Sequence, residues 1–144
     1  MRIDGEWLLC DDNIWRPIIR GEVLTGHGAW EPTEFLVDTG ADRTVFSASL
    51  LAVLHLQATA SQHQLGGVGG LADAVVVETQ IRCNHEEAGK VVLRGQYAAV
   101  TALEILDMCV LGRDIMRLFA VIIDQPGDVV CLLGQRHQYT IVQR

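Results

Sequence analysis

Short apolar runs rich in valine and isoleucine, separated by glycine and polar clusters, are the feature that most limits how this chain can fold. Runs of this length and composition are typical of β-strands, and the turn signals between them indicate an all-β fold in which helix is the minority. The expected strands are 15–24, 34–38, 74–83, 90–100, 104–111, 120–124, 129–133 and 139–142.

Two stretches carry helical spacing instead of strand alternation. Residues 47–54 open with serines suited to capping a helix and then place leucines on one face at spacings of three and four, which predicts a short amphipathic helix. A second brief turn of helix is expected after Gly112, where apolar residues recur at the same spacing up to Phe119. The Gln-Pro-Gly-Asp segment 125–128 predicts a hairpin connection between the two strands that flank it.

Length and composition indicate one globular domain. The chain has 144 residues, 49% of them hydrophobic and 20% charged, which suits a single core and argues against disorder. We therefore expect one domain over residues 1–144, with its core at about 15–133. The formal charge is −7, and the 11 basic residues are scattered, so nucleic acid is not an expected partner.

No targeting or membrane segment is evident in the sequence. The N-terminus has no apolar stretch behind a basic start, and charged residues interrupt every long apolar window, so a cytoplasmic protein without membrane attachment is expected. The four cysteines form no closely spaced pair and lie mostly in apolar surroundings, which predicts buried free thiols. The five histidines lack the spacing of zinc ligands, so neither a metal nor a cofactor is expected.

The most informative segment is 35–44, Phe-Leu-Val-Asp-Thr-Gly-Ala-Asp-Arg-Thr. Here an apolar strand ends abruptly on the carboxylate of Asp38, followed by a hydroxyl and by Gly40, which permits a tight turn. Because an unpaired carboxylate is costly to desolvate, its position at the end of a buried strand suggests a functional group. An ordinary strand-to-turn connector is the alternative for the tripeptide taken alone.

The segment 35–44 resembles the active-site segment of retropepsin-like aspartic proteases, and two further segments match that family in the same order. The glycine-rich stretch 65–71, Leu-Gly-Gly-Val-Gly-Gly-Leu, resembles the family's flap, and 110–114, Val-Leu-Gly-Arg-Asp, resembles its later Gly-Arg-Asp/Asn motif. The resemblance implies a closed β-barrel of the acid protease fold with one or two short helices, assembled as a homodimer. It covers most of the chain from about 15 to 133.

Residue roles follow from this resemblance. Asp38 would be the catalytic carboxylate, held in a loop with Thr39 and Gly40, and the Thr39 hydroxyl would hydrogen-bond across the dimer axis. Substrate would contact Ala41, Asp42 and the flap residues Gly66, Gly67, Val68 and Gly69. Val37, Val68, Leu71 and Ile105 are expected to form walls of specificity pockets.

The later motif is expected to support the active-site loop from behind. Gly112 would allow close packing there, and Arg113 would form an ion pair with Asp42. A solvated surface arginine is the alternative for Arg113. In the viral members of the family the chain ends interleave at the dimer interface, and residues 7–9 and 139–142 are the candidates for that position here.

A single Asp-Thr-Gly per chain implies that the active site forms between two chains. Aspartic protease chemistry needs two carboxylates about 3 Å apart that share one proton. The expected function is therefore that of a homodimeric aspartic endopeptidase acting on peptide or protein substrates. The alternatives are a catalytically silent dimer that binds peptides, and a small β-barrel protein whose three motif matches are coincidental.

Overall fold

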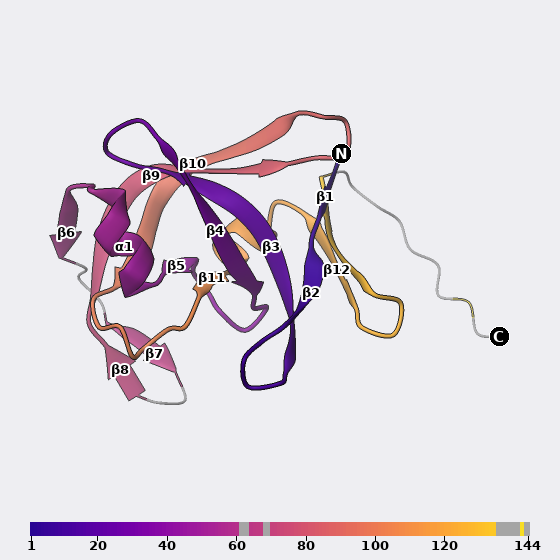
Figure 1. Ribbon diagram of the computed structural model, residues 1–144, viewed down its shortest axis with the longest axis horizontal. Helices are drawn as coiled ribbons and strands as arrows, with labels where there is room; N and C mark the ends of the chain where they lie inside the picture. Colours follow the sequence, from indigo (N-terminus) through magenta and orange to yellow (C-terminus); the bar gives the residue numbers. More distant parts are fainter. Residues whose placement is uncertain (61–63, 68–69, 135–141, 143–144) are drawn as a thin grey trace.

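The computed structural model describes residues 1–60, 64–67, 70–134 and 142, and these residues form a mostly β structure with short helices (Figure 1). The elements are β1 (Arg2–Asp4), β2 (Glu6–Leu9), β3 (Trp15–Leu24), β4 (Trp30–Val37), β5 (Val45–Phe46), α1 (Ala48–Leu54), β6 (Ala58–Ala60), β7 (Leu65–Gly67), β8 (Gly70–Ala72), β9 (Ala74–Asn84), β10 (Lys90–Val100), β11 (Cys109–Leu111), α2 (Arg113–Met116), β12 (Ala120–Asp124) and β13 (Val129–Leu133).

The described residues form one large sheet and two small ones. The large sheet has the order β2-β3-β4-β11-β5-β10-β9-β6, and β3 also pairs with β9, so the sheet curls back on itself. A three-stranded sheet of order β1-β13-β12 lies beside it, and β7 and β8 form a separate hairpin. In Figure 1 this hairpin lies at the opposite end of the molecule from the three-stranded sheet.

The centre of the large sheet brings two distant parts of the chain together. β11 lies between β4 and β5, parallel to β4 and antiparallel to β5. The parallel register joins Cys109 to Phe35 and Leu111 to Val37, so β4 and β11 end side by side. The loops that leave these two strand ends, 38–44 and the segment starting at Gly112, are therefore neighbours.

The core packs inside the curled sheet and is sealed by α1. Phe46 lies between Phe35 and Tyr97, with ring centroids 6.3 and 5.4 Å away. The α1 helix starts after Ser47, whose Oγ accepts a hydrogen bond from the Leu50 amide, and it buries Leu50 and Leu54. Each such aliphatic side chain contributes about 1.5–3 kcal/mol of stabilisation by leaving water.

Most of the long strands were predicted correctly. The expected bounds of 15–24, 90–100, 120–124 and 129–133 are confirmed, and the strand expected at 74–83 extends one residue further. β4 begins at Trp30, four residues before its predicted start at 34, and ends at Val37. The core reaches beyond its expected limits to Ile3, because β1 packs its buried residue against the sheet.

The strand prediction for 104–111 was wrong over its first five residues. Strand β11 begins only at Cys109, and the residues before it form turns and irregular chain. The apolar side chains of Ile105 and Leu106 are adjacent in sequence and both line a surface cavity, an arrangement that a pleated strand cannot give. Residues 139–141 of the expected strand 139–142 lie outside the described residues, and Val142 is exposed and in no strand.

The helix predictions are confirmed in position, although α2 ends at Met116, before Phe119. Cys83, Cys109 and Cys131 are buried free thiols, as predicted, but Cys10 is only half-buried because it lies at the turn between β2 and β3. Within the described ranges, neither helix is long and apolar enough to cross a membrane.

Candidate active site

Asp38 emerges where β4 ends, and the backbone around it holds its carboxylate in place. The Asp38 amide donates to the Leu111 carbonyl at 3.2 Å, which continues the β4–β11 pairing by one residue. The chain then turns tightly: Ala41 N–H donates to the Asp38 carbonyl at 3.1 Å, and Gly40 N–H donates to Asp38 Oδ1 at 2.9 Å. The carboxylate is half-exposed, while Thr39 and Gly40 beside it are exposed.

A buried threonine and an aspartate lock this loop to the start of α2. Thr44 is fully buried, and its amide and hydroxyl both donate to Asp114 Oδ1, at 2.9 and 2.8 Å. The Thr44 hydroxyl in turn accepts from Gly112 N–H at 3.1 Å. Because a buried polar group without a partner is costly, this closed network favours a single arrangement of the two loops.

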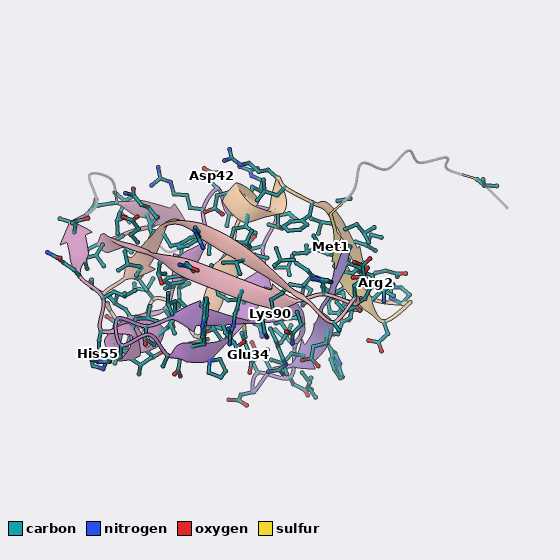
Figure 2. The ribbon with its side chains drawn as sticks, turned by 90° about the horizontal axis from the view of Figure 1, so that it is seen from above. Met1, Arg2, Glu34, Asp42, His55 and Lys90 are labelled. Atoms are coloured by element: carbon teal, nitrogen blue, oxygen red, sulfur yellow. The ribbon has the colours of Figure 1, made fainter. Side chains whose placement is uncertain are left out.

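Backbone hydrogen bonds add to the contact between the loops. The Arg113 amide donates to the Ala41 carbonyl at 2.9 Å, and the Asp114 amide donates to the Asp42 carbonyl at 3.2 Å. The first turn of α2 therefore sits directly behind the Asp38 loop. Figure 2 shows Asp42 beside this short helix.

Gly112 and Arg113, which were predicted to support the Asp38 loop, both lie against it. A Cβ on Gly112 would overlap the carbonyl group of Arg43 and lie 2.7 Å from the Thr44 nitrogen, so only glycine fits without a shift of the backbone. The Arg113 guanidinium forms an ion pair with Asp42. Both side chains are largely exposed, at 57% and 81%, so the pair contributes no more than about 1 kcal/mol.

The sequence prediction missed the interior members of this support, Thr44 and Asp114. Both stand within the quoted motifs, but neither received a role. A signal was present in the sequence, because each is a polar residue next to an apolar residue that becomes buried, Val45 in one case and Ile115 in the other, and a polar group near the core needs a hydrogen-bond partner. Their separation of 70 positions hid that each is the partner of the other.

A cavity of about 720 Å³ opens in front of Asp38. Its size is that of a typical ligand site, and its lining combines aliphatic side chains with a few polar groups. The Asp38 loop contributes one wall, the β7–β8 hairpin another, and the turns before β11 a third. The lining residues are Asp38, Gly40, Ala41, Asp42, Arg43, Val45, Gln64, Leu65, Gly66, Gly67, Gly70, Leu71, Ala72, Val100, Glu104, Ile105, Leu106 and Val110.

The β7–β8 hairpin carries part of the glycine-rich segment. Its strands pair Leu65 with Ala72 and Gly67 with Gly70, and Gly70 has a φ of +106°, which glycine adopts without strain. The hairpin is fastened at its base, where Gln64 Nε2 donates to Asp73 Oδ1 at 2.9 Å.

The structure brings most of the predicted substrate-binding residues to one cavity. Ala41, Asp42, Gly66 and Gly67 all line it, whereas Val68 and Gly69 lie outside the described residues. Of the expected pocket walls, Leu71 and Ile105 line the cavity. Val37 does not, because it points into the main core and is 5% exposed.

Among the described residues, the ionisable groups that line the cavity are three carboxylates and the guanidinium of Arg43, and no described cysteine lines it. Burial raises the pKa of the Cys83 thiol to about 11 and also raises the pKa values of the Cys109 and Cys131 thiols, so these groups are protonated and unreactive at neutral pH. The part of the chain that the structure describes contains no group of three or more histidine, cysteine or acidic residues arranged to hold a metal.

Comparison with known proteins places this arrangement in a family. The model of the aspartyl protease family matches residues 22–115, a span that holds the Asp38 loop, the glycine-rich hairpin and the start of α2. A search of curated proteins found no match.

Solved structures with similar folds include two retropepsin-type enzymes. A retropepsin-like aspartic protease from Rickettsia conorii aligns with a TM-score of 0.57 at 15% identity, covering 92% of this chain and 88% of that one. The EIAV protease in complex with the inhibitor HBY-793 aligns with a TM-score of 0.56 at 21% identity, covering 71% of this chain and 86% of that one. Since the family model spans well over half of the sequence, the chain belongs to the aspartyl protease family, and its fold is similar to that of these retropepsin-type structures.

Proposed function

We propose that this protein is a homodimeric aspartic endopeptidase whose active site forms from Asp38 of two identical chains. The observation that carries the proposal is the position of Asp38, a half-exposed carboxylate in a braced loop at the wall of a 720 Å³ cavity. The sequence contains one Asp-Thr-Gly, so a second chain must supply the second carboxylate. We further propose that residues 1–144 act as one domain and that the curled sheet is the closed barrel of this fold.

The chemistry would be hydrolysis by an activated water molecule. With the two carboxylates about 3 Å apart, one proton is shared, because like charges at that distance cannot both ionise. The ionised carboxylate takes a proton from water, whose oxygen attacks the carbonyl carbon of the peptide, while the protonated carboxyl donates to the carbonyl oxygen. Collapse of the tetrahedral intermediate breaks the C–N bond as the carboxyl that took the proton from water gives it to the leaving nitrogen, and a hydroxyl of the intermediate returns the other proton to the second carboxylate. The roles of general base and general acid are properties of the two coupled carboxylates together and are not assigned to one chain or the other.

The surrounding residues would position the substrate and the dyad. Thr39, exposed beside Asp38, would hydrogen-bond across the two-fold axis. Ala41 and Asp42 would contact the substrate backbone from one side of the cavity. Gly66 and Gly67 of the β7–β8 hairpin would cover it as part of a flap, because glycine permits the backbone changes that closure over a substrate requires. Gly112 and Arg113 would keep the Asp38 loop in place.

The test is cleavage of a mixed peptide library between about pH 4 and pH 7, read by mass spectrometry, for wild type and Asp38→Asn. This substitution preserves size and removes the charge and the shared proton. Asp128→Asn is the matched control, because Asp128 is exposed in the turn between β12 and β13 and does not line the cavity. Wild type and Asp128→Asn should give the same cuts, and Asp38→Asn should give none.

Cuts that persist in Asp38→Asn would contradict the proposal. If none of the three proteins cuts any peptide although all are folded dimers, the chain is better described as a silent peptide-binding dimer. Binding of the library peptides without cleavage, measured on the same proteins, would establish that alternative.

A further inference from the structure

An apolar stripe covers one face of the β2–β3 hairpin, made of Trp7, Leu9, Trp15 and Pro17. The register pairs Trp7 with Pro17 and Leu9 with Trp15, so the four side chains point to the same face. Trp7 packs against the main core, whereas Leu9 and Trp15 are 46% and 51% exposed. The stripe therefore runs from the core out into solvent along an edge of the large sheet.

The exposed half of the stripe extends past the strand that carries Asp38. The last pair between β3 and β4 joins Ile18 to Leu36, and β4 ends at Val37. Because β3 runs antiparallel to β4, residues 15–17 continue for about 10 Å in the direction in which the chain enters the Asp38 loop. Figure 1 shows the β2–β3 turn projecting beyond the end of β4.

The location of the stripe near the Asp38 end of the sheet indicates which partner would cover it. A second copy that brings its own Asp38 within about 3 Å of this one must approach the same end of the sheet. The β2–β3 hairpin is the element that overhangs that end, so it stands in the path of the incoming chain. We propose that the stripe is a contact surface for a second copy of this chain, an inference that rests on the shared active site of the proposed function.

The chemistry of the hairpin suits such a contact. Dimer interfaces combine an apolar centre, often with tryptophan, and a polar rim. Leu9 and Trp15 would supply the centre. The ion pair between Arg16 and Asp12, with Nη2 and Oδ2 2.6 Å apart, would lie at the rim at the hairpin turn.

The N-terminal strands β1 and β2 already pair with other strands of the same chain. Strand β1 pairs with β13, with Arg2 opposite Leu133, and β2 pairs with β3. Residues 7–9, a candidate for an interleaved chain end, thus form half of a hairpin. The hairpin presents its side chains to a partner and keeps its own strand pairing, so contact through the stripe requires no exchange of strands.

The test measures association without substrate, by sedimentation of wild type, Trp15→Ser, Leu9→Ser and Val92→Ser. Val92 is the matched control, because it is 44% exposed on β10 and belongs neither to the hairpin nor to the cavity. Trp15→Ser and Leu9→Ser should each raise the dimer dissociation constant by about 10-fold or more, and Val92→Ser should leave it unchanged. Circular dichroism checks that each variant is folded, and Leu9→Ser decides the question if Trp15→Ser does not fold.

A monomeric wild type, or hairpin variants that dimerise as tightly as wild type, would overturn the inference. The experiments distinguish failure of the contact-surface proposal from failure of the protease proposal. If the hairpin variants dissociate but wild type cleaves no peptide, the contact surface stands and the protease activity does not. If cleavage depends on Asp38 while the hairpin variants remain dimers, the activity stands and the dimer contact lies elsewhere.

Discussion

At the scale of single residues, the position of Asp38 depends on a side chain that never reaches the cavity. Thr44 is fully buried, and its hydroxyl both donates to Asp114 and accepts from the Gly112 amide. The exposed ion pair between Arg113 and Asp42 contributes far less, because water screens both charges. The interior hydrogen bonds, more than the surface charges, set the geometry of the loop.

The substitution Thr44→Val tests whether the interior hydrogen bonds contribute more than the exposed ion pair. Valine fills the same volume but leaves the Gly112 amide without its acceptor and removes one donor from Asp114, so the free energy of unfolding should fall by about 2–3 kcal/mol. Thr44→Ser keeps the hydroxyl and loses one methyl group, at a cost of about 1 kcal/mol. Denaturation by urea compares the two variants with wild type. Equal losses for valine and serine would mean that packing, not hydrogen bonding, sets the cost.

Single residues also show how much of the candidate site could be predicted from the sequence. Asp38 could be singled out because a carboxylate ending an apolar strand is unusual by itself. Ala41, Asp42, Gly66 and Gly67 followed from motif positions, and all line the cavity. Asp114 received no role, because its function depends on a threonine 70 positions away that the fold places beside it.

At the scale of elements, the parallel pairing of β4 with β11 places the loop 38–44 next to the segment that starts at Gly112. The close approach of these loops depends on Gly112, where a Cβ would overlap the Arg43 carbonyl. Gly112 therefore leaves no room for a side chain, whereas a Cβ at Gly28, Gly67 or Gly70 would meet no atom within 4 Å.

Gly112→Ala should destabilise the fold by about 1–3 kcal/mol, because the Asp38 loop must move to accept the methyl group. Gly67→Ala is the matched comparison, since a Cβ there meets nothing within 4 Å, and its free energy of unfolding should equal that of wild type. Thermal or chemical denaturation of both variants provides the measurement. A Gly112→Ala protein as stable as wild type would show that the two loops are less tightly packed than described.

Elements also differ in how well sequence predicts them. The long strands β3 and β10 have the predicted bounds, because ten or more residues give apolar patterning room to appear. β5 has two residues and β11 three, and tertiary pairing alone defines them. Residues 104–108 have strand-like composition but turn toward the cavity, so local pattern gave the wrong answer there.

At the scale of the whole molecule, the described chain carries half of the proposed reaction centre. Its main core includes Ile3 of β1 and Leu132 of β13, and the strands of the described residues pair with one another within the chain. Folding and catalysis are thus separable: a folded single chain would be inactive, and activity would depend on pairs of chains.

This separation predicts how wild type and Asp38→Asn behave when mixed. With equal amounts at constant total concentration and free exchange, about one quarter of the dimers carry Asp38 in both chains, so the cleavage rate should fall to about one quarter. A site complete within one chain would instead retain about half of the rate. Mixing wild type with Asp128→Asn should leave the cleavage rate unchanged, which would show that the exchange of chains by itself does not lower activity. A decrease that follows the square of the wild-type fraction across several ratios would require two Asp38 carboxylates in each active site, because no single-chain mechanism gives that dependence.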